Sequence, residues 1–157
     1  MSKMNNRDSK HLLDYLKSQR LMTLATCSKT PWVASVYFVT DKDLNLYFVS
    51  SPDSRHCKEI EKNEKVACAI ADSHILNSQK KYGMQIEGVA TQVKGWKKTE
   101  VMLKMWHKIN PGAEKINIAN MQSGAVSSRV YKVKPTLIKH MDKDLYGKDT
   151  YGIYKLK

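Results

Sequence analysis

The chain has 157 residues, which suits one domain built around one hydrophobic core. Hydrophobic residues make up 41% of it, enough to exclude wholesale disorder, and no apolar run approaches the roughly 20 residues that a membrane-spanning helix needs. The formal net charge of +12 favours an anionic partner such as nucleic acid, an acidic membrane surface or a phosphorylated small molecule, but the lysines are scattered and fit a solvated surface better.

Hydrophobic periodicity predicts one helix followed by a series of strands. Leu12, Leu13 and Leu16 form an apolar stripe at helical spacing, and Asp8 or Ser9 can cap that helix. The period then changes to two, which is typical of strands. We expect strands at residues 22–25, 31–39, 44–49, 66–71, 82–94 and 129–133, with extended chain continuing to residue 138. Gly88 inside the fifth strand indicates a bulge or a close backbone approach.

Two further helices interrupt the strands. A short helix opens at residues 52–54 and runs to about residue 63, and a longer one ends at residues 111–112. The longer helix has an apolar face, which we interpret as a packing surface, formed by Met102, Met105, Trp106 and Ile109.

The order of elements predicts the fold class. Strands follow one another too directly for a parallel sheet with crossover helices, so we expect a mostly β, antiparallel, Greek-key-like barrel with peripheral helices. We predict a single domain, 1–157, with an N-terminal helix in 1–20, the barrel with its inserted helices in 21–138, and a C-terminal extension in 139–157. Several strands are apolar on both faces, which favours a homodimer.

The segment from residue 48 to residue 60 carries the most chemistry. A strand ends there in hydroxyl residues and passes into a helix, whose free N–H groups and dipole favour an anion. The candidate donors and cations are Ser50, Ser51, Ser54, Arg55, His56 and Lys58. A purely structural role is also open, because Asp53 or Ser54 can simply cap the helix and Arg55 can be a solvated first-turn residue.

The same region resembles the pyridoxamine 5'-phosphate oxidase-like split-barrel family. That family has a strand ending in an aromatic and a hydroxyl residue, then Ser-Arg-Lys entering a helix, then an isoleucine, an asparagine and an apolar strand. This sequence offers matching segments at residues 46–50, 54–56, 60, 63 and 66–70, and later at 84–90 and 130–135. The resemblance extends from residue 21 to about residue 138 and implies a split β-barrel that binds FMN.

The resemblance also implies which residues hold the cofactor. The strand at residues 34–39 would lay its backbone along the flavin, and Arg55 and His56 would grip the phosphate. Gln85 would reach the flavin of the other subunit. With the hydroxyl and basic residues above, the implied FMN-binding set is Ser35, Val36, Tyr37, Phe38, Val49, Ser50, Ser51, Ser54, Arg55, His56, Lys58 and Gln85. We therefore expect a flavin-dependent oxidoreductase acting on a small molecule, with no side chain identifiable as a catalytic acid or base.

This sequence departs from the true oxidases at several positions. Ala34 stands where they have an arginine for the phosphate, Val39 where they have a lysine for the substrate, and His56 where they have a second basic phosphate ligand. Their arginine-rich C-terminal motif has no match in residues 146–157. These differences argue against oxidation of pyridoxine phosphate itself and are compatible with weaker FMN binding.

Other ligands stay open. Related split barrels bind haem or a deazaflavin, and His56 or His140 offers an imidazole for haem iron. A nucleic-acid-binding barrel is a further alternative because of the +12 charge and the strand aromatics Trp32, Tyr37, Tyr47 and Phe48. Those aromatics alternate with aliphatic residues as core strands do, which argues against nucleic acid.

Two negative patterns complete the expectations. The histidines lack metal-binding spacing, so we expect no metal site. The polar first ten residues do not resemble a secretory signal, and Cys27, Cys57 and Cys68 lack the paired spacing of disulfide frameworks. A reducing, cytoplasmic location is therefore expected.

Overall fold

The computed structural model describes residues 5–72, 74–76, 78–113 and 115–156. Within these ranges the helices are α1 (Asn6–Ser18), α2 (Arg55–Lys62), α3 (Trp96–Ile109), α4 (Ile118–Gln122), α5 (Lys143–Tyr146) and the short 3-10 helix η1 (Gly147–Asp149). The strands are β1 (Leu21–Cys27), β2 (Pro31–Thr40), β3 (Leu46–Ser50), β4 (Lys65–Ala71), β5 (Tyr82–Gln92), β6 (Arg129–Asp142) and β7 (Tyr151–Lys155).

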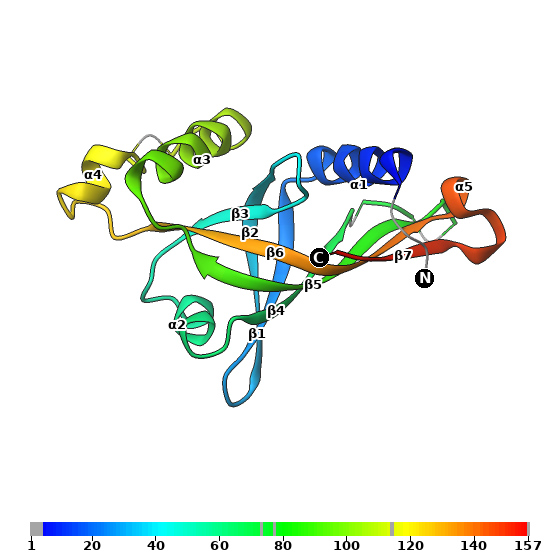
Figure 1. Ribbon diagram of the computed structural model, residues 1–157, viewed down its shortest axis with the longest axis horizontal. Helices are drawn as coiled ribbons and strands as arrows, with labels where there is room; N and C mark the ends of the chain where they lie inside the picture. Colours follow the sequence, from blue (N-terminus) through cyan, green and yellow to red (C-terminus); the bar gives the residue numbers. More distant parts are fainter. Residues whose placement is uncertain (1–4, 73, 77, 114, 157) are drawn as a thin grey trace.

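Six of these strands close into an antiparallel barrel, with the helices at its periphery (Figure 1). The order around the barrel is β3-β2-β1-β4-β5-β6, and pairing of β3 with β6 completes the circle. β7 adds a seventh strand along β6. The expected mostly β, closed antiparallel architecture with peripheral helices is confirmed, whereas the homodimer stays a prediction.

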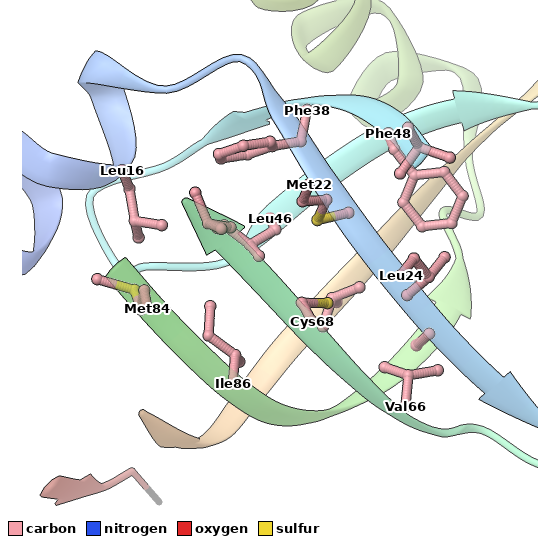
Figure 2. Packing of buried hydrophobic residues seen from close by; sticks show 14 of the residues in the cluster. Leu16, Met22, Leu24, Phe38, Leu46, Phe48, Val66, Cys68, Met84 and Ile86 are labelled. Atoms are coloured by element: carbon pink, nitrogen blue, oxygen red, sulfur yellow. The ribbon is translucent and has the colours of Figure 1, made fainter. Parts of the chain in front are cut away.

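Alternating residues of the strands fill the barrel (Figure 2). Leu24 and Phe38 are fully buried, as the period-two pattern predicts. Phe48 and Tyr131 stack inside with ring centroids 5.2 Å apart, so neither aromatic is available for stacking on an external ligand. α1 contributes Leu12 and Leu16 to the same core.

A second apolar layer explains why some strands are apolar on both faces. Val39, Tyr47 and Val130 face outward from the barrel and are buried beneath α3 and α4. Those two helices contribute the buried residues Leu103, Trp106 and Met121 to this layer. Met102, Met105 and Ile109 pack partly buried against it, which confirms the packing role predicted for the long helix.

The structure departs from the sequence-based expectations at both ends of the chain. Asn5, rather than Asp8 or Ser9, caps α1, and Asp8 completes a reciprocal capping box with it. β6 continues past residue 138 to Asp142, and the C-terminal extension contains the strand β7. Gly88 does mark a bulge, because the β5–β6 register shifts between Glu87 and Gly88.

None of the helices in the described ranges combines the length and apolar character that crossing a bilayer requires. Cys68 is buried in the core, whereas Cys27 is half-buried.

Candidate functional site

The turn from β3 into α2 brings three of the predicted polar residues together. The Oγ of Ser50 lies 2.8 Å from Nε2 of His56 and 3.3 Å from the Oγ of Ser54. Ser54 donates its own hydroxyl proton to the carbonyl of Ser51 at 2.8 Å. Burial lowers the pKa of His56, and the nearby Glu59 carboxylate opposes this effect. The cluster therefore holds a neutral imidazole beside two hydroxyl groups at neutral pH.

The N-terminus of α2 lacks a side-chain cap. Ser54 occupies the cap position, but its hydroxyl donates to the Ser51 carbonyl, lies 3.2 Å from Nε2 of His56 and makes no capping bond to a helix N–H group. Among the hydrogen bonds of the described residues, none uses the backbone N–H groups of Arg55, His56 or Cys57. Three donors and the positive end of the helix dipole are thus left together at the start of α2.

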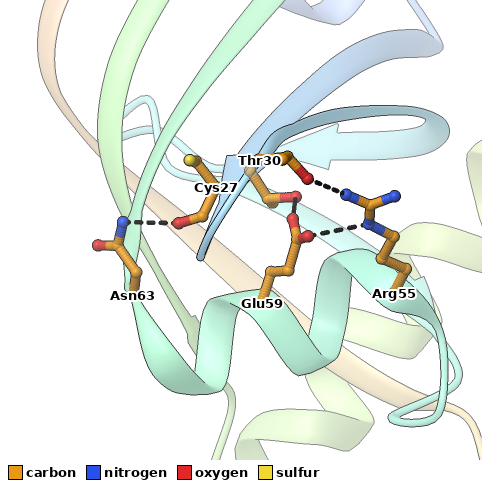
Figure 3. Close-up of polar contacts among 6 residues, drawn as sticks. Cys27, Thr30, Arg55, Glu59 and Asn63 are labelled. Atoms are coloured by element: carbon orange, nitrogen blue, oxygen red, sulfur yellow. Dashed lines mark hydrogen bonds and ion pairs between the residues drawn. The ribbon is translucent and has the colours of Figure 1, made fainter.

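Arg55 extends from this helix start toward the β1–β2 hairpin (Figure 3). Its Nε donates to Oε1 of Glu59 at 2.9 Å, and its Nη2 donates to the Oγ1 of Thr30 at 3.0 Å. The guanidinium carbon also lies 4.3 Å from the centre of the Trp32 ring, which is a cation–π contact. Arg55 is therefore a fixed side chain and not the freely solvated one that a structural role would allow.

Glu59 is a site residue that the sequence did not single out. Its carboxylate is buried, and it accepts a 2.6 Å hydrogen bond from the hydroxyl of Thr26. Hydrogen bonds from Thr26 and then Arg55 hold the pKa of Glu59 below its usual range. Asn63 forms a further hydrogen bond between the end of α2 and the hairpin by donating to the carbonyl of Cys27 (Figure 3). The spacing of Arg55 and Glu59 at i,i+4 is a readable signal, but the threonine is 33 positions from Glu59.

The predicted residues of β2 divide between the two faces of the strand. Val36 and Phe38 are buried, so they can offer a ligand only their backbone. Ser35 and Tyr37 are exposed on the outer face. β2 pairs with β1 over Pro31–Tyr37 but with β3 only from Phe38 onward, so the edge of β2 around Ser35 has no strand partner in the described sheet.

Gln85 belongs to the same outer face but lies three strands from Ser35. The register places Ser35 opposite Thr23, Thr23 opposite Ala69, and Ala69 opposite Gln85. Three strand spacings amount to about 14 Å, so these two predicted residues do not meet within one chain. These paired residues run across a surface cavity of about 460 Å³. Its lining is largely apolar and includes Val33.

The remaining predicted residues lie around the helix start. Val49 and Ser51 are half-buried beside Ser50. Lys58 is exposed and pairs at 3.2 Å with Asp53, the residue before the helix cap.

The structure also bears on the other ligands. His140 is buried between Tyr15 and Tyr146, with Nδ1 3.2 Å from the Tyr146 hydroxyl, and burial lowers its pKa. Tyr47 and Phe48 are buried, which removes two of the four aromatics from any stacking surface for nucleic acid. Over the described residues, no three His, Cys, Asp or Glu side chains gather as metal ligands.

Comparison with known proteins places this geometry in a family. A sequence profile of the family described as pyridoxamine 5'-phosphate oxidase matches residues 9–142. A UPF0306 protein of Pasteurella multocida is 35% identical over 63 residues, and the match spans 39% of this chain and 42% of that protein.

Solved structures share the fold. General Stress Protein 26 of Bacillus anthracis superposes with a TM-score of 0.64 at 18% identity, covering 94% of this chain and 98% of the other. A haem-binding protein of Mycobacterium smegmatis superposes with a TM-score of 0.69 at 12% identity, covering 99% of this chain and 60% of the other. At these identities the likeness establishes the fold alone. The family profile covers most of the sequence, and the chain therefore belongs to the pyridoxamine 5'-phosphate oxidase family.

Proposed function

We propose that the protein binds FMN as a homodimer and uses it to oxidise or reduce a small molecule at the dimer interface. The observation that carries this proposal is the uncapped start of α2, where the N–H groups of Arg55, His56 and Cys57 have no acceptor in the described chain. Family membership makes a flavin the first ligand to test at that point.

The donor set fits a phosphate monoester. Ser50 carries a hydroxyl group, and the guanidinium of Arg55 has N–H groups beyond those bound to Glu59 and Thr30. Two carboxylates of the described residues belong to this region: Glu59, whose oxygens accept from Thr26 and Arg55, and Asp53, which is paired with Lys58. A dianionic phosphate would therefore meet donors and a helix dipole rather than an opposing charge.

The unpaired edge of β2 offers a binding surface for the flavin ring. Backbone groups around Ser35 have no strand partner, so they can hydrogen-bond the polar edge of a flat ring system. The hollow near Gln85 and the exposed Val33 and Tyr37 form an apolar outer surface that a second copy would cover. In such a dimer, Gln85 of one copy would approach the ligand of the other.

A bound flavin would supply the hydride and electron transfer. The chain's part is to hold the phosphate at α2, to orient the ring against β2 and to exclude water through the dimer contact. Ala34 and Val39 provide neither the arginine nor the lysine of the true oxidases, so the proposed substrate is a small molecule other than pyridoxine phosphate.

The test is an absorption spectrum of the purified protein, followed by titrations with FMN and with riboflavin, which lacks the phosphate. We expect FMN to bind more tightly than riboflavin and to raise the melting temperature. Arg55→Ala should abolish most of the difference in affinity between FMN and riboflavin. Lys62→Ala, which removes a cation from the other end of the same helix, should leave that difference in affinity intact. A protein that binds neither flavin would overturn the proposal.

Haem is the second candidate because a protein with the same fold binds it. Neither imidazole favours it: Nε2 of His56 is hydrogen-bonded to Ser50, and His140 is enclosed in the core. A Soret band on haem titration, lost in His56→Ala, would favour haem over FMN. A deazaflavin would be revealed by the same titration format with that ligand in place of FMN.

A further inference from the structure

Arg55 is held by contacts on one side of its guanidinium group only. Glu59 accepts from Nε at 2.9 Å, Thr30 accepts from Nη2 at 3.0 Å, and the guanidinium carbon lies 4.3 Å from the centre of the Trp32 ring. A guanidinium group has five N–H bonds. These contacts use two of them, and no acceptor in the described chain takes the other three, which are on Nη1 and Nη2. The side chain is 45% exposed, so that free end is open to solvent.

Glu59 is itself fixed and charged. Its side chain is only 8% exposed, and each oxygen has a partner, Oε1 with Arg55 and Oε2 with Thr26. The two hydrogen bonds lower its pKa, which keeps the carboxylate ionised at neutral pH. The carboxylate contacts Nε, and no hydrogen bond joins it to either terminal nitrogen in the described chain.

We propose that Glu59 is the positioning residue of the anion site: it holds Arg55 against Trp32 and leaves its terminal N–H groups to the ligand. This rests on the proposed function in one respect, namely that the ligand carries a phosphate at the start of α2. An arginine in free solution samples many rotamers and loses that freedom when it binds an anion. Glu59 and Thr30 impose this order before the ligand arrives, so the binding step costs less entropy.

The opposite role is that Glu59 competes with the ligand for Arg55. The geometry favours positioning, because Glu59 occupies Nε and leaves the N–H groups of Nη1 without an acceptor in the described chain. Removing a positioning group weakens phosphate binding, and removing a competitor strengthens it. The sign of the change on mutation therefore decides the question.

The experiment is a double-mutant cycle on the full chain with Glu59→Ala, Arg55→Ala and the double variant. Dissociation constants are measured for FMN and riboflavin. Each single variant loses or weakens a charge-assisted hydrogen bond to the phosphate. We therefore expect the affinity for FMN to fall about tenfold in each of them. Riboflavin affinity should not change, which a merely structural role of Glu59 would not predict. The double variant should be no worse than Arg55→Ala, because Glu59 acts only through Arg55.

Glu61→Ala is the matched control, because it removes an exposed carboxylate from the same helix. If Glu59→Ala fails to fold, Glu59→Gln replaces it, since the amide oxygen can still accept from Nε; a loss of FMN affinity smaller than that of Arg55→Ala is then expected. Unchanged or tighter FMN binding on loss of Glu59, or losses that add in the double variant, would overturn the proposal.

A titration with inorganic phosphate, followed by the NMR signal of the Arg55 Nε–H group, separates this inference from the flavin assignment. If the wild type binds phosphate in a Glu59-dependent way but binds no FMN, the flavin assignment fails and the positioning role stands. If the wild type binds neither, both fail.

Discussion

Nε2 of His56 lies 2.8 Å from the Oγ of Ser50, across the turn that joins β3 to α2. When the ring carries its proton on Nε2, it donates to Ser50 and leaves the serine hydroxyl proton free for an anion. Burial lowers the pKa of His56, so the ring brings hydrogen bonding but little positive charge to this site at neutral pH. The site thus depends on Arg55 and the helix dipole for its charge.

Replacing His56 with lysine should therefore strengthen FMN binding. At pH 7.5 His56→Lys adds a full charge beside Ser50, and we expect about three- to tenfold tighter binding of FMN with no change for riboflavin. The difference in FMN affinity between the two proteins should narrow only as the pH falls toward the lowered pKa of His56, where the wild-type imidazole takes up a proton. Fluorescence titrations at matched pH cancel the ionisation of FMN itself. Equal affinities at pH 7.5 would contradict the prediction.

His140 should make the fold sensitive to acid. Burial lowers its pKa below the ordinary value of 6.5, so below about that pH the unfolded chain takes up a proton that the folded chain resists. Stability therefore falls as the pH drops below 6.5, by at most about 1.4 kcal/mol per pH unit. His140→Leu also removes a buried Nε2 that has no partner in the described chain.

We expect His140→Leu to reduce the difference in melting temperature between pH 7.5 and pH 5.5. His74→Gln is the control, because the His74 side chain is 94% exposed. If the wild type and both variants show the same change in melting temperature between these pH values, the acid sensitivity arises from groups other than His140.

Gly88 should tolerate no side chain. A Cβ there would lie 2.7 Å from the carbonyl oxygen of Lys134 and 2.9 Å from a methyl carbon of Val133. Gly88→Ala should lower the free energy of unfolding by about 1–3 kcal/mol. Gly83→Ala, on the same strand, meets only the flexible end of Met141 at 3.1 Å and should cost less than about 1 kcal/mol. Denaturant unfolding measures both, and equal losses would show that the bulge has room to relax.

Val33 tests the dimer. Its side chain is 59% exposed on the outer face of β2, beside the apolar hollow that includes Gln85. Val33→Asp would place a charge in the proposed interface, so we expect the variant to sediment as a monomer and to lose FMN affinity. Val101→Asp, on the equally exposed surface of α3, should leave both properties unchanged. A wild type that is itself monomeric would refute the dimer directly.

The sequence predicted the features that local pattern determines. Alternation at Met22 and Leu24 placed β1, and the glycine at position 88 placed the bulge, because strand period and loss of a side chain are local properties. The apolar stripe of α3 was readable for the same reason. α4 was missed because five residues are too few to show a helical period.

The candidate site was predicted less completely because its geometry depends on distant residues. The proximity of Ser50, Ser54 and His56 follows from one turn and could be anticipated. The direction of Arg55 could not, because Thr30 and Trp32 reach it from a hairpin that is remote in sequence. Burial of Glu59 beneath Thr26 is likewise a product of the closed barrel rather than of helix propensity.

The position of β6 in the chain has a consequence for biosynthesis. β6 pairs with β3, β5 and β7, and its first five residues provide the contact that closes the barrel, with Tyr131 opposite Phe48. A nascent chain cannot make that closure until residue 133 has left the ribosome, although five of the six barrel strands are complete by residue 92. Until then β3 and β5 present open edges, which are the surfaces on which strands of different molecules join. A chain that stopped within α4 would carry both edges permanently, so we expect it to aggregate rather than fold.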